Sequence, residues 1–133
     1  MANSYVDFRG RFVRVNDQLL TIIVLVMRDV VVSDPALRDR FGGHVDAWCE
    51  ESLGAPPGLI AFDLSAFEAD DGAAGGLATL LAATVAAIRA YGSHVPGQML
   101  NDRTRLERIR FIDTDVNVIV GELEKWRKMT GED

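Results

Sequence analysis

A histidine and a cysteine lie close together near the middle of the chain, in the segment HVDAWCEE. A histidine beside a thiolate is the pair that nucleophilic catalysis by cysteine would need. His44 and Cys49 are five residues apart, which on a helix turns their side chains about 500° from one another at about 100° per residue. Cys49 also falls on the apolar side of that helix, so we interpret it as a buried, unreactive thiol.

Neighbouring carboxylates are the second group of residues that could take part in catalysis or metal binding. Asp46 and Glu50 are one helical turn apart, and Asp70 is next to Asp71. Such pairs could act as a general acid and base or hold Mg²⁺, although acid catalysis needs a pocket that raises a pKa. A carboxylate-site enzyme therefore stays open as an alternative function, without a motif to support it.

The remaining motifs do not indicate a cofactor. His94 stands alone in the predicted turn YGSHVPG, and two histidines with one cysteine are too few for a usual structural zinc site unless carboxylates complete it. The glycine clusters GAAGG and GG lack the spacing that cradles phosphates. We expect neither a metal ion nor an organic cofactor.

The distribution of charge is unusual. The formal net charge is −6, and residues 42–88 contain seven acidic residues but no lysine or arginine. Such a segment would repel nucleic acid and attract a basic protein, because fields of one sign steer association. The alternative is that the acids only keep the protein soluble and cap helices. The residues predicted to bind the partner are Asp46, Glu50, Glu51, Glu68, Asp70 and Asp71.

An arginine-rich segment, RTRLERIRF, contains Arg103, Arg105, Arg108 and Arg110. Nucleic-acid-binding domains normally have a pI above about 9, whereas the pI of this chain is about 4.8. We expect these arginines to face residues 42–72, either within one chain or across a dimer.

The apolar run LTIIVLVMRDVVV could be either a membrane segment or an element of the protein core. Its uncharged part, from Leu19 to Met27, is shorter than the about 20 residues that a spanning helix needs. It also lacks the pattern of a secretory signal, so we expect a cytoplasmic protein. A buried central helix capped by Asn16 or Asp17 is favoured, but the β-branched residues leave a strand open.

Further helices are predicted from caps and apolar spacing. Ser33 or Asp34 would cap a helix that could split at the adjacent glycines 42 and 43. A helix after DDG carries an apolar stripe and closes at Gly92, and a short helix begins at Pro96. Asp113 or Thr114 would cap the last helix.

Two segments leave strands open. The N-terminal YVDFRGRFVRV alternates apolar and charged residues as a strand does. Residues 59–67 fit a short strand or a helical turn begun by Asp63, and we favour the turn. The sequence thus predicts one mostly α-helical, bundle-like domain over residues 1–133, with a short N-terminal strand or hairpin as an addition.

In size, acidity and expected cytoplasmic character the chain resembles bacterial toxin-neutralising immunity proteins. That resemblance implies a stoichiometric inhibitor that occludes a basic partner, such as a toxin domain, rather than an enzyme. The alternative is a homo-oligomeric structural or regulatory protein, a homodimer for example, in which the apolar run and the alanine-rich helix pack between chains.

Overall fold

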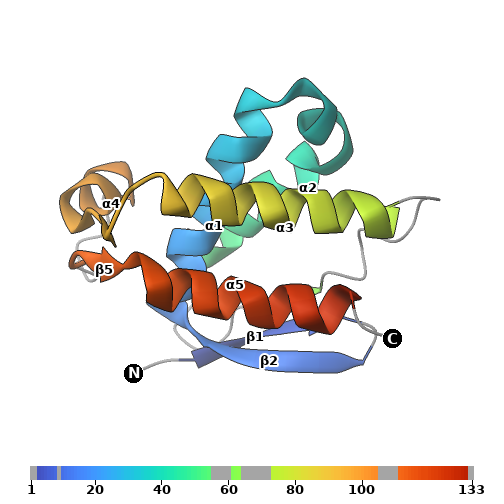
Figure 1. Cartoon of the computed structure of the whole chain (residues 1–133), viewed down its shortest axis with the longest axis horizontal. Coiled ribbons are helices and arrows are strands. Elements are labelled where there is room, and N and C mark those ends of the chain that lie inside the picture. Colours follow the sequence, from blue (N-terminus) through green and yellow to red (C-terminus); the bar gives the residue numbers. More distant parts are fainter. Residues whose placement is uncertain (1–2, 9, 55–60, 64–72, 105–110, 132–133) are drawn as a thin grey trace.

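The computed structural model describes residues 3–8, 10–54, 61–63, 73–104 and 111–131, and over these residues the protein is mostly helical (Figure 1). The predicted fold class and the N-terminal hairpin are confirmed. The elements are β1 (Asn3–Phe8), β2 (Arg11–Asn16), α1 (Asp17–Ser33), α2 (Pro35–Gly54), β3 (Ala61–Asp63), α3 (Ala73–Arg89), β4 (His94–Val95), α4 (Gly97–Thr104), β5 (Thr114–Asp115) and α5 (Val116–Gly131).

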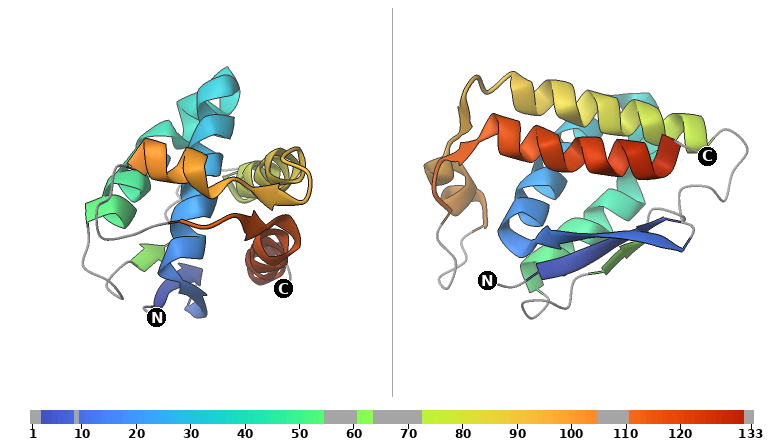
Figure 2. Two further views of the ribbon diagram at one scale, coloured as in Figure 1. Left: turned by 90° about the vertical axis from the view of Figure 1, so that its left-hand side faces the viewer. Right: turned by 60° about the horizontal axis from the view of Figure 1, so that its bottom comes forward.

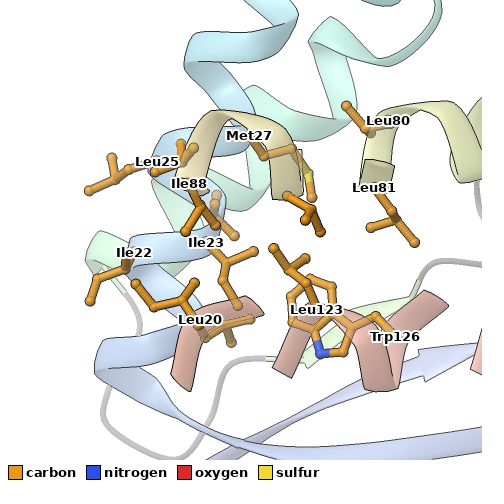
Figure 3. Close-up of a cluster of buried hydrophobic side chains, with 14 of the residues drawn as sticks. Leu20, Ile22, Ile23, Leu25, Met27, Leu80, Leu81, Ile88, Leu123 and Trp126 are labelled. Atoms are coloured by element: carbon orange, nitrogen blue, oxygen red, sulfur yellow. The ribbon is translucent and has the colours of Figure 1, made fainter. Parts of the chain in front are cut away.

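The apolar run forms α1, the central helix of the core. Asn16 caps it, since its Oδ1 accepts hydrogen bonds from the backbone N–H groups of Gln18, at 2.9 Å, and Leu19, at 3.3 Å. Every residue from Leu20 to Met27 is buried, so the helix is covered on all sides by α2, α3, α5 and the sheet (Figure 3). The run is therefore core. In the described part of the chain, no helix is long and apolar enough to cross a membrane.

Helix α2 follows α1 after a single residue. Asp34 caps it by accepting from the N–H groups of Ala36, at 3.0 Å, and Leu37, at 3.3 Å. The helix continues unbroken through the two glycines that could have split it. Glycine costs a helix about 1 kcal/mol relative to alanine, and here the buried apolar side of α2, packed on α1, offsets that cost.

Helices α3 and α5 pack side by side and run in opposite directions across α1 (Figures 1 and 2). A turn follows α3, and Gly92 adopts a φ of +93° there, as predicted for the closing glycine. The cap of α5 is Asp115, whose Oδ1 accepts from Asn117 N at 2.8 Å. The predicted caps, Asp113 and Thr114, were wrong: Asp113 accepts from Gly97 N instead.

The N-terminal hairpin belongs to a three-stranded sheet of order β2-β1-β3. Strands β1 and β2 are antiparallel, and β3 pairs parallel to β1 with Tyr5 opposite Ala61 and Asp7 opposite Asp63. Residues 61–63 are a strand added to β1, which confirms the strand alternative there, and the favoured helical turn begun by Asp63 falls on the residues that follow. Residues 64–67 lie outside the described part.

The corner between α3 and α5 is fixed by side-chain and backbone contacts. Strands β4 and β5 pair His94 with Asp115. The Asn101 side chain accepts a 2.7 Å hydrogen bond from Phe111 N and donates one of 3.0 Å to Phe111 O. Helix α4 starts at Gly97, directly after the predicted Pro96. This corner holds α4 beside the end of α1.

Candidate functional site

Three exposed acidic residues form a stripe along α2. Asp39, Asp46 and Glu50 lie within about 40° of one another on the helix, given about 100° per residue. Buried Phe41 and Trp48 lie on the opposite side of α2. The three carboxylates, which we call the acidic stripe, therefore face away from the core.

The structure places the six predicted partner-binding residues unevenly. Asp46 and Glu50 are exposed and share the acidic stripe. Glu51 belongs to α2, but its side chain is outside the described part, and so are Glu68, Asp70 and Asp71 altogether. Asp39 was not among the predicted partner-binding residues, because it precedes the segment 42–88 that lacks lysine and arginine. Its spacing of seven residues from Asp46 could have revealed it.

One charge of the acidic stripe is offset by α1. Arg28 Nε lies 3.2 Å from Asp46 Oδ1, and the two side chains are 50% and 61% exposed. An ion pair as exposed as this one contributes about 0–1 kcal/mol. Asp39 and Glu50 form no ion pair in the part of the chain described. Two carboxylates of the stripe thus have no ion-pair partner among the described residues.

A second ion pair ties α4 to α1. Arg103 Nη1 and Nη2 each lie 2.9 Å from one of the two carboxylate oxygens of Asp29, in the two-pronged geometry typical of strong arginine–carboxylate pairs. The prediction that Arg103 would face residues 42–72 within one chain was wrong, whereas such a contact across a dimer stays a prediction. The other three arginines of that segment lie outside the described residues.

A small pocket opens beside this ion pair, at the junction of α1 and α3. Its volume is about 240 Å³, and Val26, Asp29, Ala87, Ala90 and Tyr91 line it. Pockets for whole small-molecule ligands usually measure about 300–1,000 Å³. This one therefore suits a single side chain better than a larger ligand.

Cys49 is buried, as predicted, and lies close to the charged side chains of the two ion pairs described above. Its Sγ contacts Val24 O at 3.7 Å. Burial raises the pKa of the thiol to about 11, an effect that Arg28 opposes and Asp46 reinforces. The thiol is therefore protonated at neutral pH, where a nucleophile would need the thiolate.

His94 occupies an exposed position on β4. Its Nδ1 lies 3.0 Å from Ser93 Oγ, and Asp115 is its partner across the strand pair. The Asp115 carboxylate already accepts from Asn117 N. Both of these hydrogen bonds are exposed, so water competes for them and the geometry around His94 resembles a solvated turn. Among the described residues, no group of three His, Cys, Asp or Glu could hold a metal ion.

Glu122 is a buried carboxylate on α5. Its side chain is 5% exposed, and Oε2 lies 3.6 Å from Lys125 Nζ, too far for a hydrogen bond. Burial raises the pKa of this carboxyl, against the effect of the nearby Lys125 ammonium. The ionised form is thus less favourable in the folded chain than in the unfolded one.

Replacing Glu122 with glutamine should increase the free energy of unfolding at about pH 7. A raised pKa means that the folded state holds the proton more tightly, so the wild type loses stability as the pH rises above about 4.3, the ordinary pKa of a glutamate. Urea unfolding at several pH values should show a gain for Glu122→Gln that disappears near pH 4. The exposed Glu124→Gln is the control. A Glu122→Gln variant less stable than wild type at neutral pH would contradict the assignment.

Comparison with known proteins found no relative: no family model, no curated protein and no solved structure matches the chain. A functional assignment therefore rests on the residues and their geometry.

Proposed function

We propose that the protein acts stoichiometrically by binding a basic protein, with the acidic stripe of α2 as its contact surface. The observation that carries this proposal is the alignment of Asp39, Asp46 and Glu50 on the side of α2 opposite its buried face. The ion pair with Arg28 offsets one of the three charges. Arg38 and Arg40 flank Asp39, so we expect the negative field to be strongest at the Glu50 end of the stripe.

The charge of the whole chain supports the same class of partner. The net charge of −6 favours encounter with a basic surface and disfavours nucleic acid. Complementary charge increases association rates and rejects partners of the wrong sign. The finer proposal is an inhibitor of the immunity type, in which the stripe covers a basic functional cleft of a toxin domain.

Self-association is the alternative, and the surface of α3 favours it. Residues 73–88 contain no charged side chain, and Ala78, Ala82 and Ala86 are exposed there. The apolar run of α1, which the sequence offered as a second interface between chains, is instead buried within its own chain. Sedimentation of the purified protein would decide, since a monomer removes this alternative.

Reversing two charges of the stripe tests the proposed function. Asp39→Lys with Glu50→Lys changes the net charge from −6 to −2 and leaves the Arg28–Asp46 pair in place. We expect a basic protein that co-purifies with the wild type in 1:1 ratio to associate about tenfold more slowly with the variant at low salt. Biosensor kinetics would measure this, and the difference should vanish at about 1 M salt, where the Debye length is about 3 Å.

The matched control is Asp102→Lys with Glu124→Lys, which makes the same change of net charge on α4 and α5. It should associate nearly as fast as the wild type, because steering depends on where the charge lies. If both variants associated equally slowly with the partner, the change of net charge alone would explain the result, and the position of the stripe would not matter. A partner bound equally well by the stripe variant would contradict the proposal.

A further inference from the structure

The pocket at the junction of α1 and α3 has apolar walls and one carboxylate. Val26, which is 1% exposed, contributes from α1, and Ala87 and Ala90 contribute from the end of α3 and the turn after it. Tyr91 is 36% exposed and is held by a contact of its hydroxyl with Met99 Sδ at 3.5 Å. Asp29 is the charged member of the lining.

The Asp29 carboxylate retains acceptor capacity although its charge is balanced. An ionised carboxylate offers about four lone-pair sites, and Arg103 uses one on each oxygen. The Asp29 side chain is still 50% exposed. An incoming cation would meet the Arg103 guanidinium next to Asp29, and the two would repel. A neutral hydrogen-bond donor meets no such repulsion, so it is the better match.

We propose that this pocket binds a tryptophan side chain of the partner protein, with the indole ring on the apolar wall and Tyr91 and its N–H donating to Asp29. An indole is a donor without an acceptor, which suits an acceptor-only carboxylate, and tryptophan is a frequent anchor of protein interfaces. A second copy of this chain cannot supply it readily, because Trp48 and Trp126 are both buried.

The position of the pocket relates it to the acidic stripe. Asp29 follows Arg28 in α1, and Arg28 pairs with Asp46 of the stripe. Arg28, Asp46, Asp29 and Arg103 all lie close enough to Cys49 to influence the pKa of its thiol, so the stripe and the pocket are neighbours that one basic partner could contact together. This inference rests on the proposed function in one respect: the tryptophan would come from the basic partner protein.

A titration with N-acetyl-L-tryptophanamide tests the pocket without the partner protein. In ¹H–¹⁵N spectra of the full chain, we expect shifts of the backbone amides of Asp29, Ala87 and Ala90 that saturate at millimolar probe. The analogue methylated at the indole nitrogen should bind about tenfold more weakly, because it lacks the donor. N-acetyl-L-tyrosinamide tests whether a phenol serves instead.

Two matched variants locate the binding. Ala90→Leu adds a branched side chain at the pocket and should abolish the shifts, whereas Ala82→Leu, exposed two turns earlier on α3, should leave them unchanged. The same spectra report whether each variant is folded. Scattered shifts or none, equal binding of the methylated analogue, stronger binding of the phenol, or binding that survives Ala90→Leu would each overturn the proposal. These outcomes would leave the acidic stripe unaffected, because its own test does not involve the pocket.

Discussion

Replacing Trp126 with alanine should lower the free energy of unfolding by about 3–5 kcal/mol, the usual cost of truncating a buried tryptophan. Trp126 is fully buried on α5, and Figure 3 shows it beside Leu123 in the cluster that joins α1, α3 and α5. The truncation would remove apolar contacts and leave a cavity that neighbouring helices only partly fill. Urea unfolding followed by far-UV circular dichroism measures the loss.

Trp126→Phe separates packing from hydrogen bonding at the same position. The indole Nε1 is buried and has no hydrogen-bond partner among the described residues, so phenylalanine removes no hydrogen bond seen there and leaves a smaller cavity than alanine does. We therefore expect it to destabilise the fold less than alanine does. An alanine variant within about 1 kcal/mol of the wild type would show that this cluster is not the centre of the core.

Replacing Gly97 with alanine should have the second large effect, a loss of about 1–3 kcal/mol or more. A Cβ at this position would lie 2.4 Å from Phe111 O and 2.6 Å from Ile112 C. Both contacts are with backbone, so no side chain can turn away to relieve them. The segment held by Asn101 would have to move, and thermal unfolding should show a clearly lower midpoint.

Gly121→Ala is the matched control for this change. Gly121 is exposed within α5, and no atom of the described part of the chain lies within 4 Å of a Cβ built there. Alanine favours a helix over glycine by about 1 kcal/mol, so this variant should be more stable than the wild type. If both alanine variants were equally stable, the close approach at Gly97 would be disproved.

The helices could be predicted from the sequence because their ends are encoded locally. Asn16 and Asp34 cap helices through side-chain oxygens that reach backbone groups two and three residues later. The start of α5 shows the limit of such arguments. Several acceptors precede that helix, and the hydrogen bond from Gly97 to Asp113 decides which of them is free to cap it.

Contacts between distant segments were not predictable. The strand at residues 61–63 is short, and its conformation depends on pairing with β1, which no local pattern encodes. The same holds for the candidate site. Exposure of Asp46 and Glu50 followed from the helical spacing, but the partners of Arg28 and Arg103 depend on how three helices pack.

The parallel pairing of β1 with β3 also orders the assembly of the sheet. The hairpin of β1 and β2 is local and can close early, whereas Tyr5 meets Ala61 only after α1 and α2 have been made. The pairing of β3 with β1 is therefore a late step. Until it is complete, one edge of β1 is unpaired and open to mispairing with other chains. We therefore expect aggregation of this chain to start from molecules in which β3 has not yet paired with β1.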